Sequence, residues 1–401
     1  MTRNETIPTR ASAGWRRGVL GHVRFDRHEL AGSLGDLGTF LPLLVGMAAQ
    51  NGLDFASALF FAGLFSVVTG LTFAVPMAVQ PMKAIAAVAL TEGLTVSEIV
   101  AAGITVSAVV LLLGLSGLID AVDRLVPRSV VRGLQLALGL SLLIKGVQMV
   151  GRTHAALGAD SYTTAVLATL VVLALAGSRR VPSALVLFGG GVVLALVRDP
   201  SLAGSLEIGF GLPRWAPPAW DDFVRAFPRA VLPQIPLTTL NSVIAVCALS
   251  RDLFPDRPAS PRRVATSVGL MNLVAGWFGG MPMCHGAGGL AGQYRFGART
   301  NGSILVLGVG KMALAVLAGS SLMALCQAFP ASVLGVMLAF SGVELALVTR
   351  DQTERTAAFT MLLTAGACLG FDHVGVGFVV GLVLSLVLRA LGPRAEAAAQ
   401  R

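Results

Sequence analysis

Long apolar runs separated by short polar stretches dominate the pattern of hydrophobic and polar positions. Helices that cross a bilayer need about 16 to 22 such residues. We count fourteen segments of this kind, centred near residues 40, 65, 84, 108, 138, 169, 190, 240, 272, 290, 314, 340, 362 and 382. The third and the tenth are interrupted by polar or glycine-rich residues. The pattern predicts an all-α polytopic membrane protein.

Part of this sequence occurs twice. Six residues of the first copy recur in register at a constant shift of 206 residues: Gly63, Leu64, Val68, Gly70, Pro76 and Met77 return as Gly269, Leu270, Val274, Gly276, Pro282 and Met283. Composition alone would give roughly one or two chance identities over such a window. The hydrophobic run breaks after each Pro-Met pair, at Gln80-Pro81-Met82-Lys83 and at Cys284-His285-Gly286-Ala287-Gly288-Gly289. Paired broken segments are typical of a transporter's binding site.

A Pro/Trp-rich stretch after the seventh segment divides the chain into two halves. We expect a cytoplasmic N-terminal tail over 1–27, a first seven-segment repeat over 28–203, an external loop over 204–229, a second repeat over 230–391 and a cytoplasmic tail over 392–401. An odd number of segments in each half places the two copies in opposite orientation. The organisation is therefore a 7+7 inverted repeat of fourteen transmembrane segments.

Composition supports the membrane assignment and sets the orientation. Mean hydropathy is +0.77, and 55% of residues are hydrophobic while 13% are charged, which excludes an ordinary soluble domain. The net charge of +9 comes from residues scattered through loops, so nucleic acid is not expected as a partner. Twenty-two arginines fall in loops and tails predicted to be inside, against five outside: Arg152, Arg198, Arg214, Arg225 and Arg229. This bias predicts a multi-pass protein of the cell (inner) membrane with both termini cytoplasmic.

Three smaller expectations follow from the termini and the cysteines. The polar first 27 residues contain no apolar stretch before a small-residue cleavage site, so we expect no cleaved signal peptide. Few residues follow the last segment, so we expect no cytoplasmic regulatory domain. The four cysteines lie in or beside apolar segments without metal-ligand spacing, so we expect free thiols and no metal or other cofactor.

The two breaks carry the candidate substrate site. Helices that begin at mid-membrane expose unpaired N–H groups and a positive dipole end, and two inverted ones point at the same place and favour an anion. Glycine amides can be approached closely by an oxyanion. The residues assigned to substrate binding on this basis are Gln80, Met82, Lys83, His285, Gly286, Ala287, Gly288, Gly289 and Gln293.

Several of these residues, and two arginines that follow them, have more than one interpretation. Lys83 lies at the wrong end of a helix dipole unless an anion is present; alternatively it reaches a membrane face or pairs with Asp36. Gln80 donates to an oxyanion or forms a helix-to-helix hydrogen bond. His285 donates to the anion, titrates or is a structural histidine. Arg295 and Arg299 suit the cytoplasmic end of the second half-helix or act as anchors.

An intramembrane carboxylate marks a candidate coupling site. Asp36 lies within the first segment, where such residues usually mark a substrate or ion path. The repeat shift relates Asp36 to Ser242, in the polar run from Thr238 to Ser242. We therefore assign possible roles in coupling to H⁺ or Na⁺ to Asp36, Thr39, Thr239 and Asn241. A structural pairing of Asp36 with Lys83 is the alternative. No role follows from spacing for three further residues in apolar runs, Lys145, Lys311 and Glu344.

At the two breaks the chain resembles a known family. The run from Pro76 to Ala84 is similar to the first signature of the molybdate transporter family, and the run from Met281 to Thr300 to the second. This family is a distant branch of the sulfate permease superfamily, which the stretch from Asn272 to Pro282 also resembles. The resemblance implies a core domain and a gate domain, with short strands leading into half-helices three and ten. It also implies tetrahedral oxyanions as substrates.

The leading functional hypothesis is thus a secondary oxyanion transporter working by alternating access, for molybdate first and sulfate second. Asn241 departs from proton-coupled relatives of this fold, which often carry an acidic residue in the eighth segment, so the coupling ion stays open. Rival hypotheses are a nucleobase or bicarbonate carrier of the same fold, an anion channel or a membrane enzyme. The sequence contains no catalytic constellation, so we do not expect an enzyme. A homodimer is left open.

Overall fold

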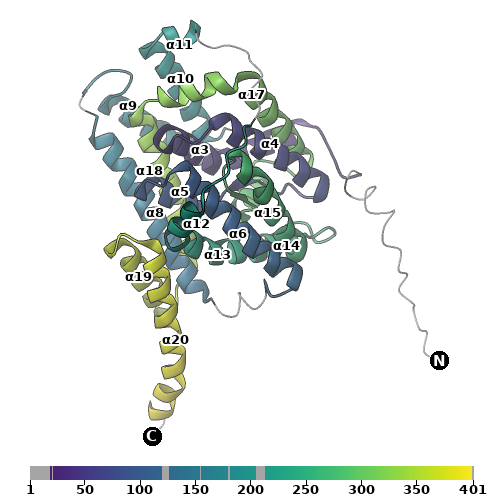
Figure 1. The fold of residues 1–401 in the computed structure, drawn as a ribbon, viewed down its shortest axis with the longest axis vertical. Helices are drawn as coiled ribbons and strands as arrows, with labels where there is room; N and C mark the ends of the chain where they lie inside the picture. Colours follow the sequence, from purple (N-terminus) through teal and green to yellow (C-terminus); the bar gives the residue numbers. More distant parts are fainter. Residues whose placement is uncertain are drawn as a thin grey trace, which may run out of the picture.

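The computed structural model describes residues 19, 21–119, 126–153, 155–178, 181–204 and 213–399. Several predicted positions lie outside these residues: most of the N-terminal tail, residues 205–212 of the external loop, and Arg3, Arg10, Arg16, Arg17, Arg124, Arg179, Arg180 and Arg401. The described chain is mostly helical, as predicted (Figure 1). Within these described ranges, six helical stretches are long and apolar enough to cross a membrane: Arg27–Asn51, Phe55–Thr72, Val96–Ser116, Arg128–Gly151, Trp220–Leu253 and Ala331–Asp351. Four shorter apolar stretches accompany them: Tyr162–Leu175, Ser183–Arg198, Gly302–Ala318 and Val374–Leu388.

The elements before the Pro/Trp-rich stretch are α2 (Arg27–Ser33), the 3₁₀ turn η1 (Leu34–Asp36), α3 (Leu37–Asn51), α4 (Phe55–Thr72), β1 (Gln80–Pro81), α5 (Lys83–Glu92), α6 (Val96–Ser116), α8 (Arg128–Gly151), α9 (Tyr162–Leu175), α10 (Ser183–Arg198) and α11 (Ser201–Gly204).

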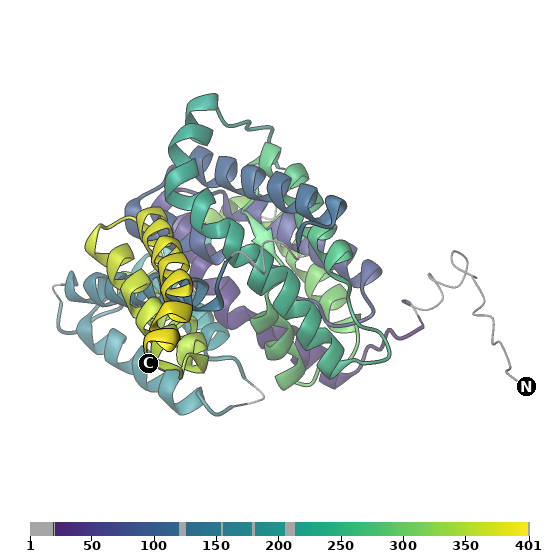
Figure 2. The ribbon, with the colours of Figure 1, turned by 90° about the horizontal axis from the view of Figure 1, so that it is seen from below.

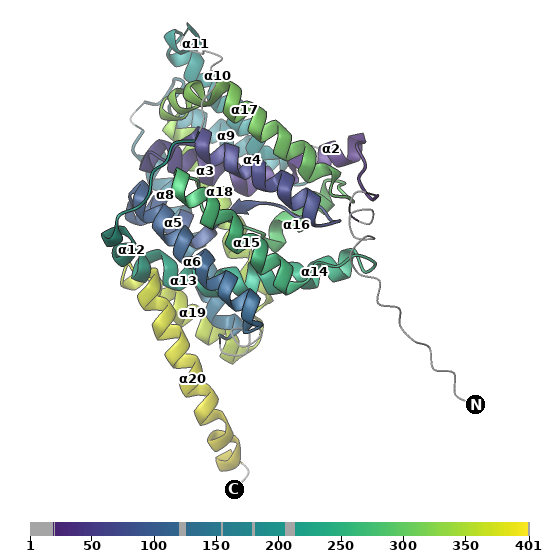
Figure 3. The ribbon, with the colours of Figure 1, turned by 45° about the vertical axis from the view of Figure 1, so that its right-hand side comes forward.

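The elements after it are α12 (Trp220–Ala226), η2 (Phe227–Val231), α13 (Leu232–Leu237), η3 (Thr238–Ala245), α14 (Val246–Leu253), α15 (Pro261–Ala275), η4 (Gly276–Phe278), β2 (Met283–Cys284), α16 (Ala287–Arg295), α17 (Gly302–Gln327), α18 (Ala331–Leu347), η5 (Val348–Asp351), α19 (Arg355–Gly370) and α20 (Val374–Ala399). Helix α20 continues through most of the predicted cytoplasmic tail and extends away from the rest of the molecule (Figure 3).

Helix starts are specified by local side chains. Asp54 accepts from the amide of Ala56 at the start of α4, at 3.0 Å. Thr95 and Glu98 form a reciprocal capping box at the start of α6, which satisfies two otherwise unpaired amides. Asp26 caps α2, and the amide of Glu29, followed by that of His28, keeps the pKa of Asp26 below its usual value. These caps place the ends of the membrane-crossing segments.

The long helices pack closely because glycines face each other across them. A Cβ on Gly63 of α4 would lie 2.7 Å from the carbonyl oxygen of Gly308 on α17, and a Cβ on Gly308 would lie 2.7 Å from that of Gly63. Helices α8 and α18 meet in the same way, at Gly139 with Gly342 and at Gly146 with Gly335. Inside a bilayer, such small residues let backbones approach and gain van der Waals contact.

Prolines shape the segment from α12 to α14. Pro228, Pro233 and Pro236 lie within it, and each removes one amide donor from the helical ladder. The helix takes the wider π form over η2 and again over η3. Such π-helical turns often occur at functional sites, and η3 contains Thr239, Asn241 and Ser242.

Candidate functional site

The two broken segments meet in the interior as a short antiparallel pair of strands. In β1 and β2, Gln80 is the register partner of Cys284 and Pro81 that of Met283. The amide of Met82 also donates to the carbonyl of Pro282, at 2.9 Å. Helices α5 and α16 begin directly after these strands, among helices of both halves (Figure 2). The starts of the two short helices therefore lie side by side.

Asn272 of α15 fixes the second strand from outside the pair. Its side-chain oxygen accepts from the amide of Met283 and its nitrogen donates to the carbonyl of the same residue, both at 2.6 Å. Because the strands are two residues long, they leave most edge groups without ladder partners. The Asn272 amide supplies both hydrogen bonds for Met283, so this side chain holds the break in addition to the strand pairing.

Lys83 and Gly288 face each other across the two helix starts. Lys83 is half-buried and Gly288 is exposed, and a Cβ built on Gly288 would lie 3.8 Å from Nζ of Lys83. Among the described residues, no side chain accepts from the first-turn amides of Ala287 and Gly288. An accessible ammonium group thus lies opposite unpaired helix amides, which is an arrangement suited to an anion.

The neighbouring glycines have a different role from Gly288. A Cβ on Gly289 would lie 2.8 Å from Cδ of Gln80, and a Cβ on Gly286 would overlap the Gln80 side-chain oxygen. Both glycines are buried. They are needed because the Gln80 side chain packs directly against the start of α16.

Gln80 joins this packing to Asp36. Its Nε2 donates to Oδ1 of Asp36, and both residues are almost fully buried, at 1% and 2% exposure. Within the described part of the chain, Oε1 of Gln80 and Oδ2 of Asp36 have no hydrogen-bond partner. Buried polar atoms without partners are costly. The Gln80–Asp36 pair therefore has unused hydrogen-bonding capacity at the centre of the molecule.

The start of α5 differs from what the sequence predicts. The amides of Ala84 and Ile85 donate to Oε1 of Gln234 in α13, at 2.8 and 3.2 Å. Nε2 of Gln234 donates in turn to Thr238, at 2.7 Å. A neutral side-chain amide from the eighth segment therefore caps α5. We expected the amides of Ala84 and Ile85 to be free for an anion, and this expectation is wrong. At the candidate anion site, α5 therefore contributes the ammonium group of Lys83, and α16 contributes the free main-chain amides.

Both ring nitrogens of His285 are engaged by other protein groups. Its Nε2 lies 2.8 Å from the Ser267 hydroxyl and its Nδ1 lies 3.0 Å from the carbonyl of Ala78. The ring is fully buried and meets the edge of Phe73. With both nitrogens engaged, His285 joins α15 to the segment before β1. Its position favours the structural reading of this residue.

The polar residues of the eighth segment take several roles. Ser242 donates to Sγ of Cys284 at 3.2 Å, next to β2. Thr239 bonds to its own helix, at the carbonyls of Ile235 and Pro236. Asn241 and, in the first segment, Thr39 are half-buried. The hydrogen bonds of the described residues do not connect these two side chains to Asp36.

Two remaining predicted residues lie within the packed interior. Met82 is fully buried between β1 and α5, and Gln293 is fully buried on α16. Ser303 of α17 donates to Oε1 of Gln293 at 2.9 Å, and Nε2 of Gln293 has no partner among the described residues. Gln293 is therefore held by the helix that follows it.

Lys311 is a central residue to which the sequence assigned no role. It lies on α17 with 6% exposure, and its Nζ is 3.6 Å from the ring centroid of Phe40 on α3. Its charge also acts on Asp36. An isolated lysine in an apolar run is a signal for a functional group, but only the fold reveals which carboxylate it faces.

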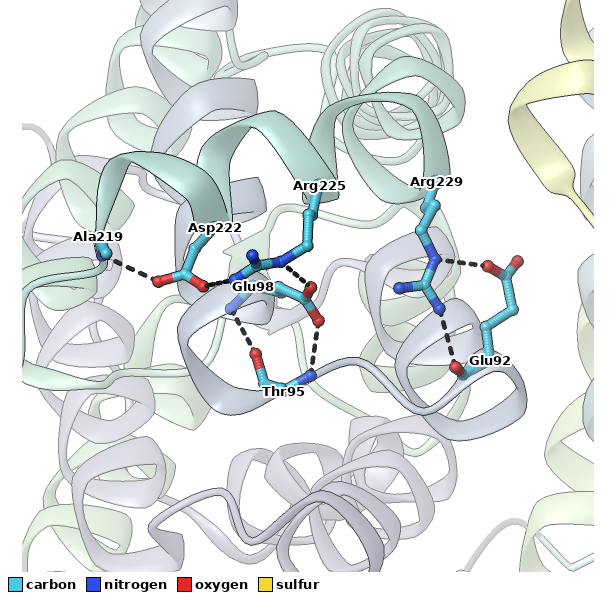
Figure 4. A network of polar contacts seen from close by, with 7 residues as sticks. All are labelled: Glu92, Thr95, Glu98, Ala219, Asp222, Arg225 and Arg229. Carbon is cyan, nitrogen blue, oxygen red and sulfur yellow. Dashed lines mark hydrogen bonds and ion pairs between the residues drawn. The ribbon is translucent and has the colours of Figure 1, made fainter.

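Ion pairs hold the opposite end of α5 (Figure 4). Arg229 of η2 contacts Glu92 through the carboxylate at 3.0 Å and through the main-chain carbonyl at 2.8 Å. Arg225 of α12 contacts Glu98 at 2.9 Å and Asp222 at 2.7 Å. Because Gln234 follows in the same segment, both ends of α5 are attached to the α12–α13 region.

Residues of the strand pair line neither of two cavities. One of about 250 Å³ is lined by residues that include Phe73, Arg257 and Arg263, and one of about 480 Å³ by residues that include Asp160 and Arg198. Neither is lined by Lys83 or Gly288. Within the described residues, no cluster of three or more His, Cys, Asp or Glu side chains offers a metal site.

Comparisons with known proteins identify the family of this chain. Residues 28–142 and 226–345 match the family described as "Molybdate transporter of MFS superfamily". Molybdate transporter 2 of Arabidopsis thaliana is 40% identical, with 95% of this chain and 91% of the relative covered. Molybdate transporter 1 of Arabidopsis thaliana is 40% identical (90% and 88% covered), and molybdate transporter 1 of Chlamydomonas reinhardtii is 37% identical (93% of each).

Solved structures show which fold this is. The transmembrane domain of a cyanobacterial bicarbonate transporter, BicA, superposes with a TM-score of 0.61 at 18% identity, covering 90% of this chain and 98% of that one. The murine anion transporter Slc26a9 in the inward-facing state superposes with a TM-score of 0.66 at 13% identity, covering 96% and 74%. The chain thus has the fold of membrane anion transporters, and its close relatives are transporters rather than enzymes. On sequence, this chain belongs to the molybdate transporter family.

Proposed function

We propose that this protein is a secondary transporter of a tetrahedral oxyanion, with molybdate as the first candidate. The observation that carries the proposal is the approach of the Lys83 ammonium group to the exposed, uncapped start of α16 at Gly288. A flexible ammonium group and fixed helix amides together neutralise an oxyanion without a metal. The names of the Arabidopsis and Chlamydomonas relatives favour molybdate.

Sulfate is the second candidate. It is also a tetrahedral dianion, so Lys83 and the α16 amides recognise the same charge and shape. Nucleobase carriage is less compatible with a site that pairs a cation with helix amides. Bicarbonate remains a candidate because BicA shares the fold. A channel is distinguished by current that does not saturate with anion concentration.

We infer that transport works by alternating access in a 7+7 inverted repeat. Support comes from equivalent contacts in the two halves. Asp36 contacts Gln80 of β1, while Ser242, at the same repeat position, contacts Cys284 of β2. Helices of the two halves also pack against each other in equivalent pairs: α4 lies against α17, and α15 lies against α6. In this proposal α5 and α16 are the half-helices of a core domain, and both termini face the cytoplasm of an inner-membrane protein.

Uptake of labelled molybdate into proteoliposomes tests the proposal. We expect saturable uptake that unlabelled molybdate blocks more strongly than sulfate. Lys83→Ala should reduce uptake at least about tenfold, because it removes a charge-assisted contact. Lys145→Ala removes another lysine from a membrane-crossing helix and is the matched control. Unchanged uptake by Lys83→Ala would reject the site, and stronger competition by sulfate would reverse the order of the two anions.

A further inference from the structure

Two buried ionisable groups near the strand pair are incompletely satisfied. Asp36 is 2% exposed and Lys311 is 6% exposed. Gln80 donates to Oδ1 of Asp36, but in the described part of the molecule neither Oδ2 of Asp36 nor Nζ of Lys311 has a hydrogen-bond partner. A buried ion with unmet hydrogen bonds is unfavourable. Both groups therefore have capacity for a further partner.

The aromatic ring of Phe40 holds the Lys311 ammonium group against the segment that carries Asp36. The Nζ lies 3.6 Å from the ring centroid, and Phe40 follows Asp36 by about one helical turn on the same segment. A ring face attracts an ammonium group but accepts no full hydrogen bond. Lys311 is thus stabilised in place while its three N–H donors stay available.

The charges around Asp36 come from several elements. Lys311 of α17 and Lys83 of α5 act on it electrostatically, as does the Gln80 hydrogen bond from β1. Helix α16 meets η1 at Gly292, which is uncharged. Cys284 of β2 also interacts with Asp36, and Glu344 of α18 interacts with Lys83. Glu344 is exposed, so water screens it more than the buried groups.

The balance of buried charge changes with loading. One carboxylate, Asp36, and two ammonium groups, Lys83 and Lys311, leave one excess positive charge when the site is empty. A bound divalent oxyanion converts this into one excess negative charge. A single proton on Asp36 then makes the loaded site neutral. Net charge in a low-dielectric interior is costly. The protein therefore changes more easily between the states open to each side of the membrane when the loaded site is neutral.

Resting on the proposed function, we propose that Asp36 and Lys311 form a proton-coupling pair: each divalent oxyanion is carried with one proton, which Asp36 takes up. The proton comes from water on the side of loading and forms an O–H bond at the free Oδ2, because Gln80 already occupies Oδ1. Lys311, released from its carboxylate counter-charge, then balances the anion together with Lys83. On unloading, the proton and the anion leave to the other side, and Asp36 again neutralises one lysine.

Wild-type protein in proteoliposomes tests the stoichiometry directly. We expect molybdate-for-molybdate exchange without a gradient, and net uptake that accelerates when the outside is acidic. The reversal potential should correspond to one proton for each dianion. Absence of exchange would reject the proposed function itself. Exchange with no proton movement, or with two protons for each anion, would reject the coupling pair while leaving the proposed function intact.

Variants separate loading from the return of the empty site. Asp36→Asn mimics the protonated carboxyl, so exchange should persist while the response to a pH gradient disappears. Its net uptake should fall at least about tenfold, because the empty site must return with two uncompensated charges. Lys311→Gln should weaken molybdate binding about tenfold, and Lys311→Arg should restore it. Lys145→Gln is the matched control and should behave as wild type.

Folding is controlled by a second variant. Asp36→Asn/Lys311→Gln restores one excess positive charge in the empty site, so it should be better folded than Asp36→Asn. Its loaded site keeps one excess negative charge, so its transport should be slow and should not respond to pH. Size-exclusion chromatography and thermal unfolding report whether each variant is intact. Retention of the wild-type pH-gradient response in a folded Asp36→Asn or in the double variant would overturn the inference. If neither variant folds, the wild-type stoichiometry decides the question.

Discussion

Gly288 lies opposite Lys83, and one carbon added to Gly288 would bring it into contact with the ammonium group. A Cβ on Gly288 would be 3.8 Å from Nζ of Lys83, which is ordinary van der Waals contact. The same addition at Gly289 would meet the buried Gln80 side chain at 2.8 Å. The two adjacent glycines thus have different roles. Gly288 leaves the helix start accessible next to Lys83, and Gly289 allows the Gln80 side chain to pack against α16.

Substitution of Gly288 should therefore affect transport without affecting folding. We expect Gly288→Ala to reduce molybdate uptake only a few-fold and Gly288→Leu to abolish it, because the larger side chain fills the space next to Lys83. The free energy of unfolding should change by less than about 0.5 kcal/mol, because the position is exposed and outside any packing contact. Gly310→Leu, at an exposed helix position with open space around it, is the control. Full uptake by Gly288→Leu would contradict the predicted anion position.

The Gln234 cap predicts two different outcomes for two substitutions. Gln234→Leu removes the acceptor for Ala84 and Ile85, and leaving buried amides unpaired should lower the free energy of unfolding by about 1–3 kcal/mol. Gln234→Glu keeps the acceptor and suits the helix dipole, so it should fold. Its added negative charge near Lys83 should raise KM for molybdate. Gln148→Glu adds the same charge at an exposed position of α8 and should leave KM unchanged.

The His285 contacts predict a stability defect rather than a binding defect. His285→Ala removes hydrogen bonds to Ser267 and to the carbonyl of Ala78 and leaves a cavity beside Phe73. We expect a loss of about 2–4 kcal/mol in the free energy of unfolding. Protein that folds at low temperature should bind molybdate with wild-type affinity in calorimetry. Selective loss of affinity with normal stability would instead place the imidazole at the anion.

The ion pairs at the far end of α5 should differ in strength. Arg229 is 27% exposed and contacts Glu92 at 10% exposure, while Arg225 is 55% exposed. Exposed pairs contribute little because water screens them. We expect Arg229→Gln to lower stability by about 1 kcal/mol, partly through the lost contact with the helix C-terminal carbonyl. Arg225→Gln should cost less, and comparison of their unfolding midpoints in one detergent measures the difference.

Much of this arrangement is predictable from the sequence because it is local. The repeated Pro-Met pairs and the residues after them predict two interrupted segments, and the structure brings these together as β1 and β2. The opposition of Lys83 and Gly288 is consistent with helix starts that converge. Arg299 likewise contacts the carbonyls of Tyr294 and Ala298 at the end of α16, where the helix dipole favours a cation.

The remaining contacts are tertiary and have no local signature. Gln234 caps a helix about 150 residues earlier in the chain, and nothing in its neighbours reveals the target. Lys311 lies over the Phe40 ring and acts electrostatically on Asp36 only because α17 packs on the first segment. His285 stands beside the glycines in sequence, yet its ring nitrogens contact Ser267 and the carbonyl of Ala78. The sequence thus predicts which residues lie near the break, whereas the direction of each side chain depends on tertiary packing.

The exchange of helix partners also limits how the chain can be divided. Helix α4 rests on α17 through Gly63 and Gly308, while α6 rests on α15 beside Gly269. Helices of each half consequently pack against helices of the other half. Cutting the chain in the Pro/Trp-rich stretch between the halves would expose glycine-lined surfaces on both fragments. Fragments produced separately should be degraded, whereas fragments produced together should reassociate without a covalent link.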